Sequence, residues 1–440
     1  MKLPHISEVK VTAMKERISV KNFSVIDSIE MDVKPITILI GPQSTGKSLM
    51  AKLVYFFKSL PAEMTNAVID VYNKRELDGM IRTRFNKIFP QYLLKDKIFN
   101  VTYYYDDQSI SITNEKAKTY KSLKISYSRS ILSNFNALKR TYRNTPGQDS
   151  FSKSYDRTLL RTMISNELNR FFYGINHLLT IYIPAGRSYF VNVKEKIFSM
   201  LFEDYNIDYM LKQFGSVLES FKQAYAHLTK EKNNPLCRFF SEILGGEYGF
   251  DKEKEWISMK DNRFVLLKDS SSGQQEVVPL VVSLIAMTGL KVEGSYTFIE
   301  EPEAHLFPES QGKIVDFLGI IYNTLKRNAG FFITTHSPYI LTFLNNFIQA
   351  ENVYNQLTGM YTRGSIDAET RDKQIKALDK LVNPGTRVAF DDVCVYVVRD
   401  GTGKDIKNYE HKLIDASVID DVSNSTARIF DGLLDLSFGE

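Results

Sequence analysis

Residues 17–40 alternate between hydrophobic and polar positions and finish in the apolar run 36–40. Alternation with a period of two predicts β-strands, and a short continuous apolar run predicts a strand buried on both faces. Residues 49–60 are compatible with a helix that ends at Pro61. The pattern therefore predicts an opening hairpin, a buried strand and a helix, with a short polar loop between the strand and the helix.

The rest of the chain divides into an irregular middle and a more regular second half. From residue 254 onward apolar runs alternate with helical patterns, which favours a parallel sheet covered by helices. Residues 351–390 are polar and carry no clear pattern. Strands are expected at 98–127 (as hairpins), 180–183, 256–259, 264–267, 296–300, 331–335 and 393–398. Helices are expected at 62–97, 129–178, 193–245, 276–290, 309–327, 338–347 and 418–436.

The polar loop after the buried strand contains a phosphate-binding pattern, Gly-x-x-x-x-Gly-Lys-Ser. Its glycines allow backbone amides to surround phosphate oxygens, Lys47 would neutralise the β- and γ-phosphates of ATP, and Ser48 would offer a hydroxyl to Mg²⁺. A glycine-rich turn that merely contains a lysine would not need a strand before it and a helix after it. The residues expected to bind the nucleotide here are Gly41, Gln43, Ser44, Thr45, Gly46, Lys47 and Ser48.

Two acidic residues end the apolar strand at 296–300, and a histidine follows the next strand. Glu300 would hold Mg²⁺, and Glu301 would act as general base on the attacking water. Two adjacent carboxylates repel each other unless a cation compensates, which argues against an ordinary acidic strand end. His336 would contact the γ-phosphate and report its presence, although a lone histidine is more often structural.

A serine-rich loop precedes the helix expected at 276–290. Its hydroxyl and amide groups at Ser271, Gly273 and Gln274 would bind a γ-phosphate from outside the phosphate loop. One chain cannot easily surround its own nucleotide from both sides, so this second face is expected from another copy. The alternative is a flexible loop, and only its order among the other motifs favours the functional interpretation.

The composition is that of a water-soluble globular protein, with 43% hydrophobic and 25% charged residues among 440. Cys237 and Cys394 are far apart, which excludes a disulfide framework and fits a reducing cytoplasm. The longest apolar stretch, Val277–Leu290, contains Pro279 and is too short for a membrane span. We therefore expect a cytoplasmic protein with no membrane partner.

One segment departs from the near-neutral charge of the chain. Lys116–Arg161 contains eleven Lys or Arg residues against two Asp, whereas the whole chain has a net charge of +4. Such a block predicts a surface that meets a polyanion such as DNA or RNA. A solvated helical face explains the same pattern equally well.

These motifs, in this order, resemble the ABC-type ATPases of the SMC and RecF lineage. They resemble more closely the stand-alone AAA-15/AAA-21 or OLD-like ATPases of bacterial anti-phage defence, similar in form to PtuA of Septu and AriA of PARIS systems. The resemblance covers roughly residues 17–60 and 178–350, and it is most specific at Phe298–Leu306 and Thr334–Pro338. It implies an α/β fold: an ABC-type P-loop ATPase head of mixed sheet and helices, with an antiparallel β subdomain and a helical insertion.

The resemblance also implies roles for individual residues. Lys47 would be the Walker A lysine, Glu301 the catalytic glutamate, Ser271 and Gly273 the signature residues acting in trans, and Glu303–Leu306 the D-loop. The place of the usual Q-loop glutamine is taken by Ile183–Arg187, which makes Arg187 a candidate for contact with the nucleotide or with a neighbouring subunit.

We expect four units along the chain. They are an N-terminal lobe with the phosphate loop (1–75), a β subdomain with a helical insertion (76–250), a C-terminal lobe with the signature, acidic pair and histidine (251–350), and an extension that completes the head (351–440).

Three functions remain open at this point. The leading one is an ATP-binding and hydrolysing sensor or scaffold in a defence complex. It would form a homodimer or higher homo-oligomer through its heads and control a separately encoded effector. The second is a RecF-like DNA-repair ATPase that uses the basic segment. The third is an OLD-like nuclease with an unrecognised site around Asp391 and Asp400, although these aspartates flank a strand and are more simply read as its solvated ends.

Overall fold

The computed structural model describes residues 15–90, 98–114, 123–144, 154–175, 178–193, 208–229, 235–251, 254–259, 261, 263–290, 294–325, 329–415, 429, 431 and 433. Of the helix expected at 418–436, only residues 429, 431 and 433 are described, and the rest lies outside the described residues. Parts of the basic segment, such as residues 145–153, also lie outside them. No helix in the described ranges combines the length and the apolarity that crossing a bilayer requires.

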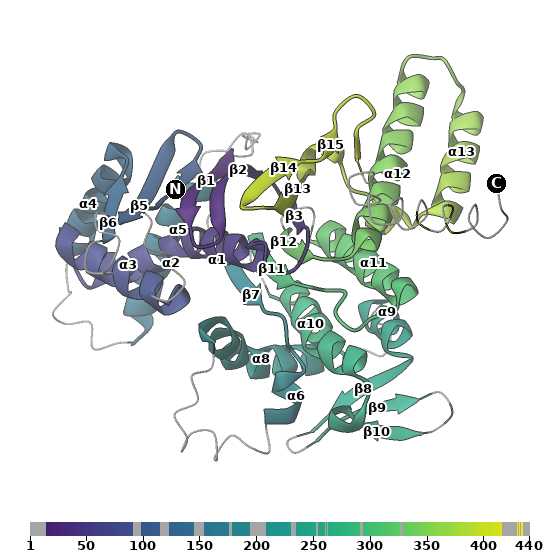
Figure 1. Cartoon of the computed structure of the whole chain (residues 1–440), viewed down its shortest axis with the longest axis horizontal. Helices are drawn as coiled ribbons and strands as arrows, with labels where there is room; N and C mark the ends of the chain where they lie inside the picture. The colour runs from purple at the N-terminus through teal and green to yellow at the C-terminus, as the bar shows by residue number, and fades with distance from the viewer. Residues whose placement is uncertain are drawn as a thin grey trace, which may run out of the picture.

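An eleven-stranded mixed sheet runs through the molecule in the order β6-β5-β4-β1-β2-β14-β13-β3-β12-β11-β7 (Figure 1). In the described part, neighbouring strands pair in parallel in one half of the sheet, which comprises β13, β3, β12, β11 and β7. Neighbouring strands pair antiparallel in the other half, which comprises β6, β5, β4, β1 and β2. The strands are β1 (Glu16–Phe23), β2 (Ile26–Val33), β3 (Ile36–Ile40), β4 (Asn100–Tyr105), β5 (Gln108–Asn114), β6 (Leu123–Tyr127), β7 (Leu178–Ile183), β11 (Gly294–Glu300), β12 (Ala329–Thr335), β13 (Val393–Arg399) and β14 (Thr402–Asp405).

Helices cover both faces of the parallel half, because its strands carry apolar side chains on both sides. In β3, Leu39 packs into one core and Ile38 into the other. The first core involves α1 (Lys47–Lys58), α2 (Leu60–Ile69), α3 (Lys74–Ile88), α4 (Arg129–Asn144) and α5 (Ser154–Tyr173). The second involves α8 (Tyr209–Leu228), α9 (Pro235–Leu244), α10 (Ser272–Thr288), α11 (Pro308–Thr324) and α12 (Pro338–Thr362). A mixed sheet with helices on both sides and an antiparallel part confirms the predicted α/β fold class.

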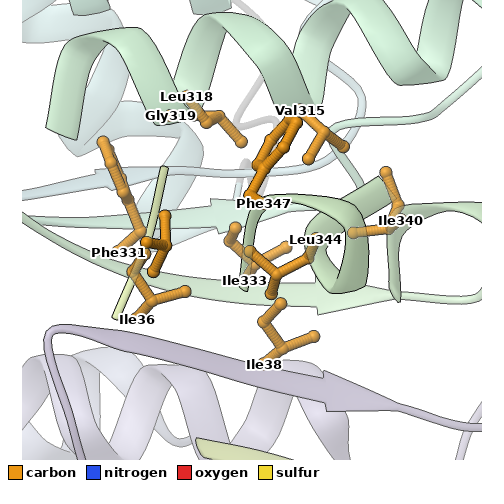
Figure 2. Close-up of a pocket in the computed structure, with 11 residues that line it drawn as sticks. Ile36, Ile38, Val315, Leu318, Gly319, Phe331, Ile333, Ile340, Leu344 and Phe347 are labelled. Atoms are coloured by element: carbon orange, nitrogen blue, oxygen red, sulfur yellow. The ribbon is translucent and has the colours of Figure 1, made fainter. Parts of the chain in front are cut away.

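Packing in the second core is close but not perfect. Figure 2 shows Ile38 and Ile333 of the sheet facing Val315 of α11 and Leu344 of α12. They line an apolar cavity of about 20 Å³. A space of that size holds no more than one small atom, and its apolar lining gives water no hydrogen-bond partner. This cavity is therefore a packing defect and not a ligand site.

Some elements differ from the expectations. A small separate sheet, β8 (Gly246–Phe250), β9 (Glu255–Met259) and β10 (Phe264–Leu266), includes a strand that we did not predict. The unassigned polar region forms the end of α12 and α13 (Ala368–Leu381), a helical hairpin whose outer turns are largely exposed (Figure 1). The remaining short elements are α6 (Tyr189–Val193), η4 (Leu267–Asp269), η5 (Pro384–Thr386), η6 (Phe390–Asp392), β15 (Lys407–Asn408) and β16 (Leu413–Ile414).

Candidate active site

The phosphate loop connects β3 to α1 and depends on two glycines with positive φ. Gly41 has φ 153°, and a Cβ there would lie 2.2 Å from the carbonyl oxygen of Val398 in β13. Gly46 caps α1 at φ 101°, where a Cβ would lie 3.1 Å from side-chain atoms of Val25 and Ile26. Both positions favour glycine, so the turn and its close approach to neighbouring backbone specify these two residues.

The loop presents free donors to an incoming anion. Within the described part of the chain, no group accepts a hydrogen bond from the backbone amides of Ser44, Gly46 or Lys47. The Lys47 ammonium donates to the carbonyl oxygens of Gly41 (2.8 Å) and Pro42 (2.6 Å). Burial lowers the pKa of Lys47 to about 8, although the carboxylates of Glu301 and Glu303 oppose that shift. Free amides together with a partly buried lysine ammonium fit a phosphate chain.

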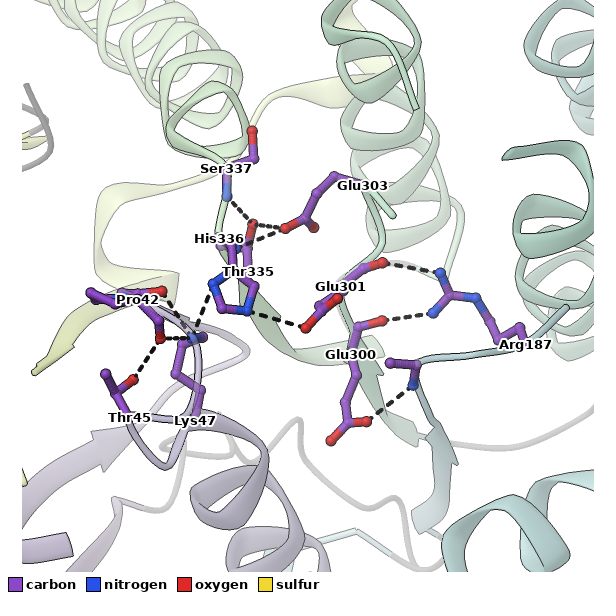
Figure 3. A network of polar contacts seen from close by, with 12 residues as sticks. Pro42, Thr45, Lys47, Arg187, Glu300, Glu301, Glu303, Thr335, His336 and Ser337 are labelled. Atoms are coloured by element: carbon purple, nitrogen blue, oxygen red, sulfur yellow. Dashed lines mark hydrogen bonds and ion pairs between the residues drawn. The ribbon is translucent and has the colours of Figure 1, made fainter. Parts of the chain in front are cut away.

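Lys47, His336 and Glu301 form a continuous line of polar contacts (Figure 3). The Lys47 Nζ lies 3.4 Å from His336 Nδ1, and His336 Nε2 lies 3.2 Å from Glu301 Oε1. Because an ammonium group only donates, Nδ1 accepts and the Nε2–H donates to Glu301. The structure therefore brings together three residues that the sequence places in three separate motifs.

Backbone geometry at the ends of β11 and β12 holds these groups. Glu301 has φ 44°, and its amide donates to Thr334 O at 2.8 Å across the two parallel strands. Glu303 is buried, and its Oε1 accepts hydrogen bonds from Thr335 Oγ1 (2.6 Å) and from the His336 amide (2.8 Å). The D-loop carboxylate thus fixes the backbone from which the His336 ring projects.

The Glu300 carboxylate is held by residues at and just after the end of β7. Its Oε1 accepts from the Tyr182 hydroxyl at 2.6 Å, and its Oε2 accepts from the Ala185 amide at 3.0 Å. Each carboxylate oxygen retains a lone pair for a metal ion or a metal-bound water. Ser48 is exposed at the start of α1. In the part of the chain that the structure describes, no three His, Cys, Asp or Glu residues cluster as metal ligands. A metal at this site would therefore depend on the nucleotide for most of its ligands, and hard oxygen donors such as Ser48 and Glu300 suit Mg²⁺.

Arg187 is fully buried, which corrects the expectation that it contacts the nucleotide or another subunit directly. Its guanidinium donates to the carbonyl oxygens of Glu300 (2.6 Å), Glu301 (3.0 Å) and Pro184 (3.2 Å). Its Nε donates to the carbonyl oxygen of Glu276 and lies 3.3 Å from the Glu276 carboxylate. A side chain with this set of partners supports the acidic pair from behind (Figure 3).

The signature residues lie at the N-terminus of α10. Ser271 is the N-cap, and it forms a capping box with Gln274. Gly273 packs so closely on the D-loop that a Cβ would lie 2.8 Å from the His305 carbonyl oxygen. The side-chain hydrogen bonds of Ser271 and Gln274 in the described ranges are with each other and with Leu244, and none joins them to the phosphate loop.

The other proposed site residues lie elsewhere. Asp391 is exposed in η6, where the neighbouring Asp392 accepts a hydrogen bond from the Tyr322 hydroxyl at 2.9 Å, and Asp400 occupies the turn between β13 and β14. In the described part of the basic segment, exposed cations lie on or beside β6 and α4 at Lys124, Arg129, Arg140 and Arg143.

A family model described as an AAA ATPase domain, AAA_15, matches residues 14–341. The chain belongs to the AAA_15 ATPase family. Members of this family are nucleotide-dependent ATPases, which agrees with a phosphate loop, an acidic pair and a histidine gathered at one edge of the sheet. No curated protein matches this chain.

Solved structures similar to this chain include heads of SMC proteins and RecF. An SMC head bound to the C-terminal winged-helix domain of ScpA is 11% identical, with 89% of this chain and 96% of the other covered and a TM-score of 0.39. The SMC head of Thermotoga maritima is 11% identical over 75% and 91% of the two chains, with a TM-score of 0.35. The recombination mediator RecF is 10% identical over 90% and 98%, with a TM-score of 0.32. Similarity at this level assigns neither a function nor a partner.

Sequence reasoning missed two residues of this site, Tyr182 and Glu276. Tyr182 lies in a strand that we predicted, but its hydroxyl is paired with a carboxylate more than a hundred positions away. Glu276 had a detectable signal, since it is a carboxylate at the start of the apolar stretch Val277–Leu290 and is itself 2% exposed. An acid placed that deep requires a buried cation.

Proposed function

We propose that this AAA_15 ATPase binds and hydrolyses ATP and that two copies are needed to complete each site. The observation that carries the proposal is the line from Lys47 through His336 to Glu301, set beside a loop of free amides. Lys47 and the loop amides would bind the β- and γ-phosphates. Glu301 would accept a proton from the attacking water, and His336 would orient that carboxylate. Mg²⁺, held by Ser48 and Glu300, would supply charge neutralisation to the phosphates.

The requirement for two copies rests on the position of α10. Ser271 and Ser272 are exposed at its N-terminus, where unsatisfied amides and the helix dipole favour an anion. Their hydrogen bonds in the described residues do not reach the phosphate loop of the same chain. The γ-phosphate that they bind would therefore belong to a second copy, which would reciprocate under two-fold symmetry.

A mixing experiment tests this arrangement. Lys47→Ala removes the phosphate-binding lysine, whereas Ser271→Asp keeps an N-cap acceptor but places a negative charge against phosphate. Each variant alone should be inactive. A 1:1 mixture should recover at most about a quarter of the wild-type rate, since half of the dimers are mixed and each has one intact site.

Ser271→Asn keeps the cap without the charge and is the matched control for Ser271→Asp. Native mass spectrometry should show that mixed dimers form. Mixed dimers that form without any recovery of hydrolysis would contradict trans completion.

We further propose that the ATPase acts as the sensor or scaffold subunit of an anti-phage defence complex. This is supported by the head residues gathered around Lys47 and by the finding that no three His, Cys, Asp or Glu residues cluster as a metal centre among the described residues, which leaves effector chemistry to a separately encoded partner. Co-purification with the product of the neighbouring gene, using ATP and Glu301→Gln, tests it. A stable assembly supports the proposal. A chain that remains alone with ATP, yet dimerises when DNA is added, contradicts it.

A RecF-like DNA-binding ATPase is the second candidate. It is favoured by the exposed cations Lys124, Arg129, Arg140 and Arg143 around α4. Contacts from such residues to phosphates release counterions, so DNA affinity should fall steeply with salt. Duplex DNA binding measured between 50 and 200 mM salt, roughly the range where that loss is large, decides the question. Affinity that is absent, or that does not change with salt, removes this candidate.

A further inference from the structure

Glu276 and Arg187 form a buried ion pair between two segments that serve different nucleotides in the proposed dimer. Glu276 lies in the first turns of α10, three positions after Gly273, whereas Arg187 follows β7 in the turn that leads to α6. Their side chains are 2% and 0% exposed, respectively. The pair therefore joins the signature helix to the segment behind the acidic pair without contact with solvent.

The hydrogen bonds of this ion pair hold main-chain groups of the neighbouring segments in place. The Glu276 carboxylate accepts hydrogen bonds from the amides of Arg187 (3.0 Å) and Ser188 (3.1 Å). Arg187 in turn donates to the carbonyl oxygens of Glu300 and Glu301. Because these carbonyls belong to the residues whose carboxylates would hold Mg²⁺ and activate water, a shift of α10 changes the position of both carboxylates.

A second contact connects α10 with the same site. Gly273 packs against the backbone of His305, and the D-loop carboxylate of Glu303 holds the amide of His336. The N-terminal turns of α10 thus act on Glu300 and Glu301 through Arg187 and on His336 through the D-loop. The fixed fork of the guanidinium can bridge Glu276 and two carbonyls together, which a lysine ammonium cannot do.

We propose that Arg187 and Glu276 are positioning residues that couple the rate of hydrolysis to the position of α10. The inference rests on the proposed two-copy ATPase. When α10 of one copy binds the nucleotide of the other copy, α10 shifts. Arg187 transmits this shift of α10 to Glu300 and Glu301 of its own chain. Each site then hydrolyses ATP faster when its chain is also docked on the nucleotide of the partner.

The first test separates binding from catalysis in the full-length protein. Arg187→Lys and Glu276→Gln should each lower kcat about 10- to 100-fold, as expected for a misplaced catalytic group. The Kd for a fluorescent ATP analogue should change less than about twofold, since neither residue touches the phosphate loop. The double variant should lose no more than the worse single variant, because residues that act as one unit are not additive.

Arg84→Lys is the matched control. Arg84 pairs with Glu63 between α3 and α2, outside the proposed site. The substitution is the same and also affects a partly buried ion pair. The thermal stability of the Arg84→Lys variant should therefore fall while its kcat stays that of the wild type. Losses of kcat that add in the double variant, or that occur only in proportion to unfolding, would overturn the coupling.

A second readout does not depend on hydrolysis. Trp256, the single tryptophan of the chain, lies in β9 of the small sheet that η4 links to α10. ATP should change its emission in Glu301→Gln, and adding Arg187→Lys should preserve that change, because α10 still docks on the nucleotide of the partner. A lost response while analogue binding persists would place Arg187 in the docking of α10 and would overturn the inference. A wild type that binds ATP but never hydrolyses it would instead refute the proposed function, and Trp256 would still test the coupling.

Discussion

The Nε2 of His336 lies 3.2 Å from Oε1 of Glu301, so the histidine holds the proposed general base in a defined orientation. The contact joins the ends of two adjacent parallel strands, β11 and β12. Both side chains remain about one third exposed, at 36% for Glu301 and 28% for His336. They therefore face the region where a γ-phosphate and an attacking water would lie, instead of being closed into the core.

Glu301→Gln should abolish hydrolysis and keep nucleotide binding. The amide retains the shape of the side chain but cannot accept the proton of the attacking water, so single-turnover hydrolysis should slow by about 10²- to 10⁴-fold. The Kd for a fluorescent ATP analogue should stay the same or fall, because a negative charge near the phosphates is removed. Glu309→Gln, on the exposed start of α11, should change neither quantity. Normal turnover by Glu301→Gln would assign the general base to another group.

ATP affinity should depend on pH through Lys47. Burial lowers the pKa of this lysine to about 8, and only the protonated ammonium binds phosphate well. The phosphates of ATP are fully ionised above pH 7.5, so Kd should rise as the pH passes about 8, approaching tenfold per pH unit. Lys47→Arg binds more weakly but stays charged, so its Kd should be flat to pH 9.5. A flat wild-type profile would contradict the lowered pKa of Lys47.

Local features of the site could be predicted from the sequence because they follow from short-range chemistry. The apolar run 36–40 forms β3, and the glycines that bracket Gln43–Thr45 form the phosphate loop. The strands that end at Glu300 and Thr335 are equally apolar and were predicted within two residues at each end. Their alignment in the sheet places Glu301 and His336 side by side.

The features that we missed depend on contacts between distant segments. The hairpin β13–β14 inserts between β3 and β2, and no local pattern predicts such a pairing. Arg187 was expected to contact the nucleotide or a neighbouring subunit, because Ile183–Arg187 takes the place of the usual Q-loop glutamine, yet it is buried, which for an arginine requires a partner. Its partner Glu276 is 89 positions away. The α12–α13 hairpin has little apolar periodicity because much of it packs on itself and faces solvent.

Gly41→Ala should damage the protein more than Gly46→Ala. A Cβ at Gly41 meets the Val398 carbonyl oxygen of a central strand, which cannot move aside, whereas at Gly46 it meets the ends of two side chains. Strained backbone and overpacking together should cost Gly41→Ala about 2–4 kcal/mol of unfolding free energy and most of its nucleotide binding. Chemical denaturation and analogue binding measure both effects. Equal losses for the two variants would show that the contact with β13 does not constrain the loop.

Glu303→Ala should reduce kcat without direct loss of a phosphate contact. The variant leaves the Thr335 hydroxyl and the His336 amide without their acceptor in a buried place, at a cost of about 1–3 kcal/mol. His336 would then be less well fixed against Glu301, so kcat should fall while the Kd for ATP changes little. Glu303→Gln keeps an oxygen that accepts both hydrogen bonds and should retain an intermediate kcat.

The ordering of these variants separates positioning from charge. Glu303 also raises the pKa of Lys47 through its negative charge. If charge were its main role, Glu303→Gln and Glu303→Ala would lose equal activity and would both shift the pH dependence of ATP binding to lower pH. If the hydrogen bonds to Thr335 and His336 dominate, Glu303→Gln stays well above Glu303→Ala at constant pH. Steady-state hydrolysis at pH 7.5, with the Kd measured across the pH range, distinguishes the two roles.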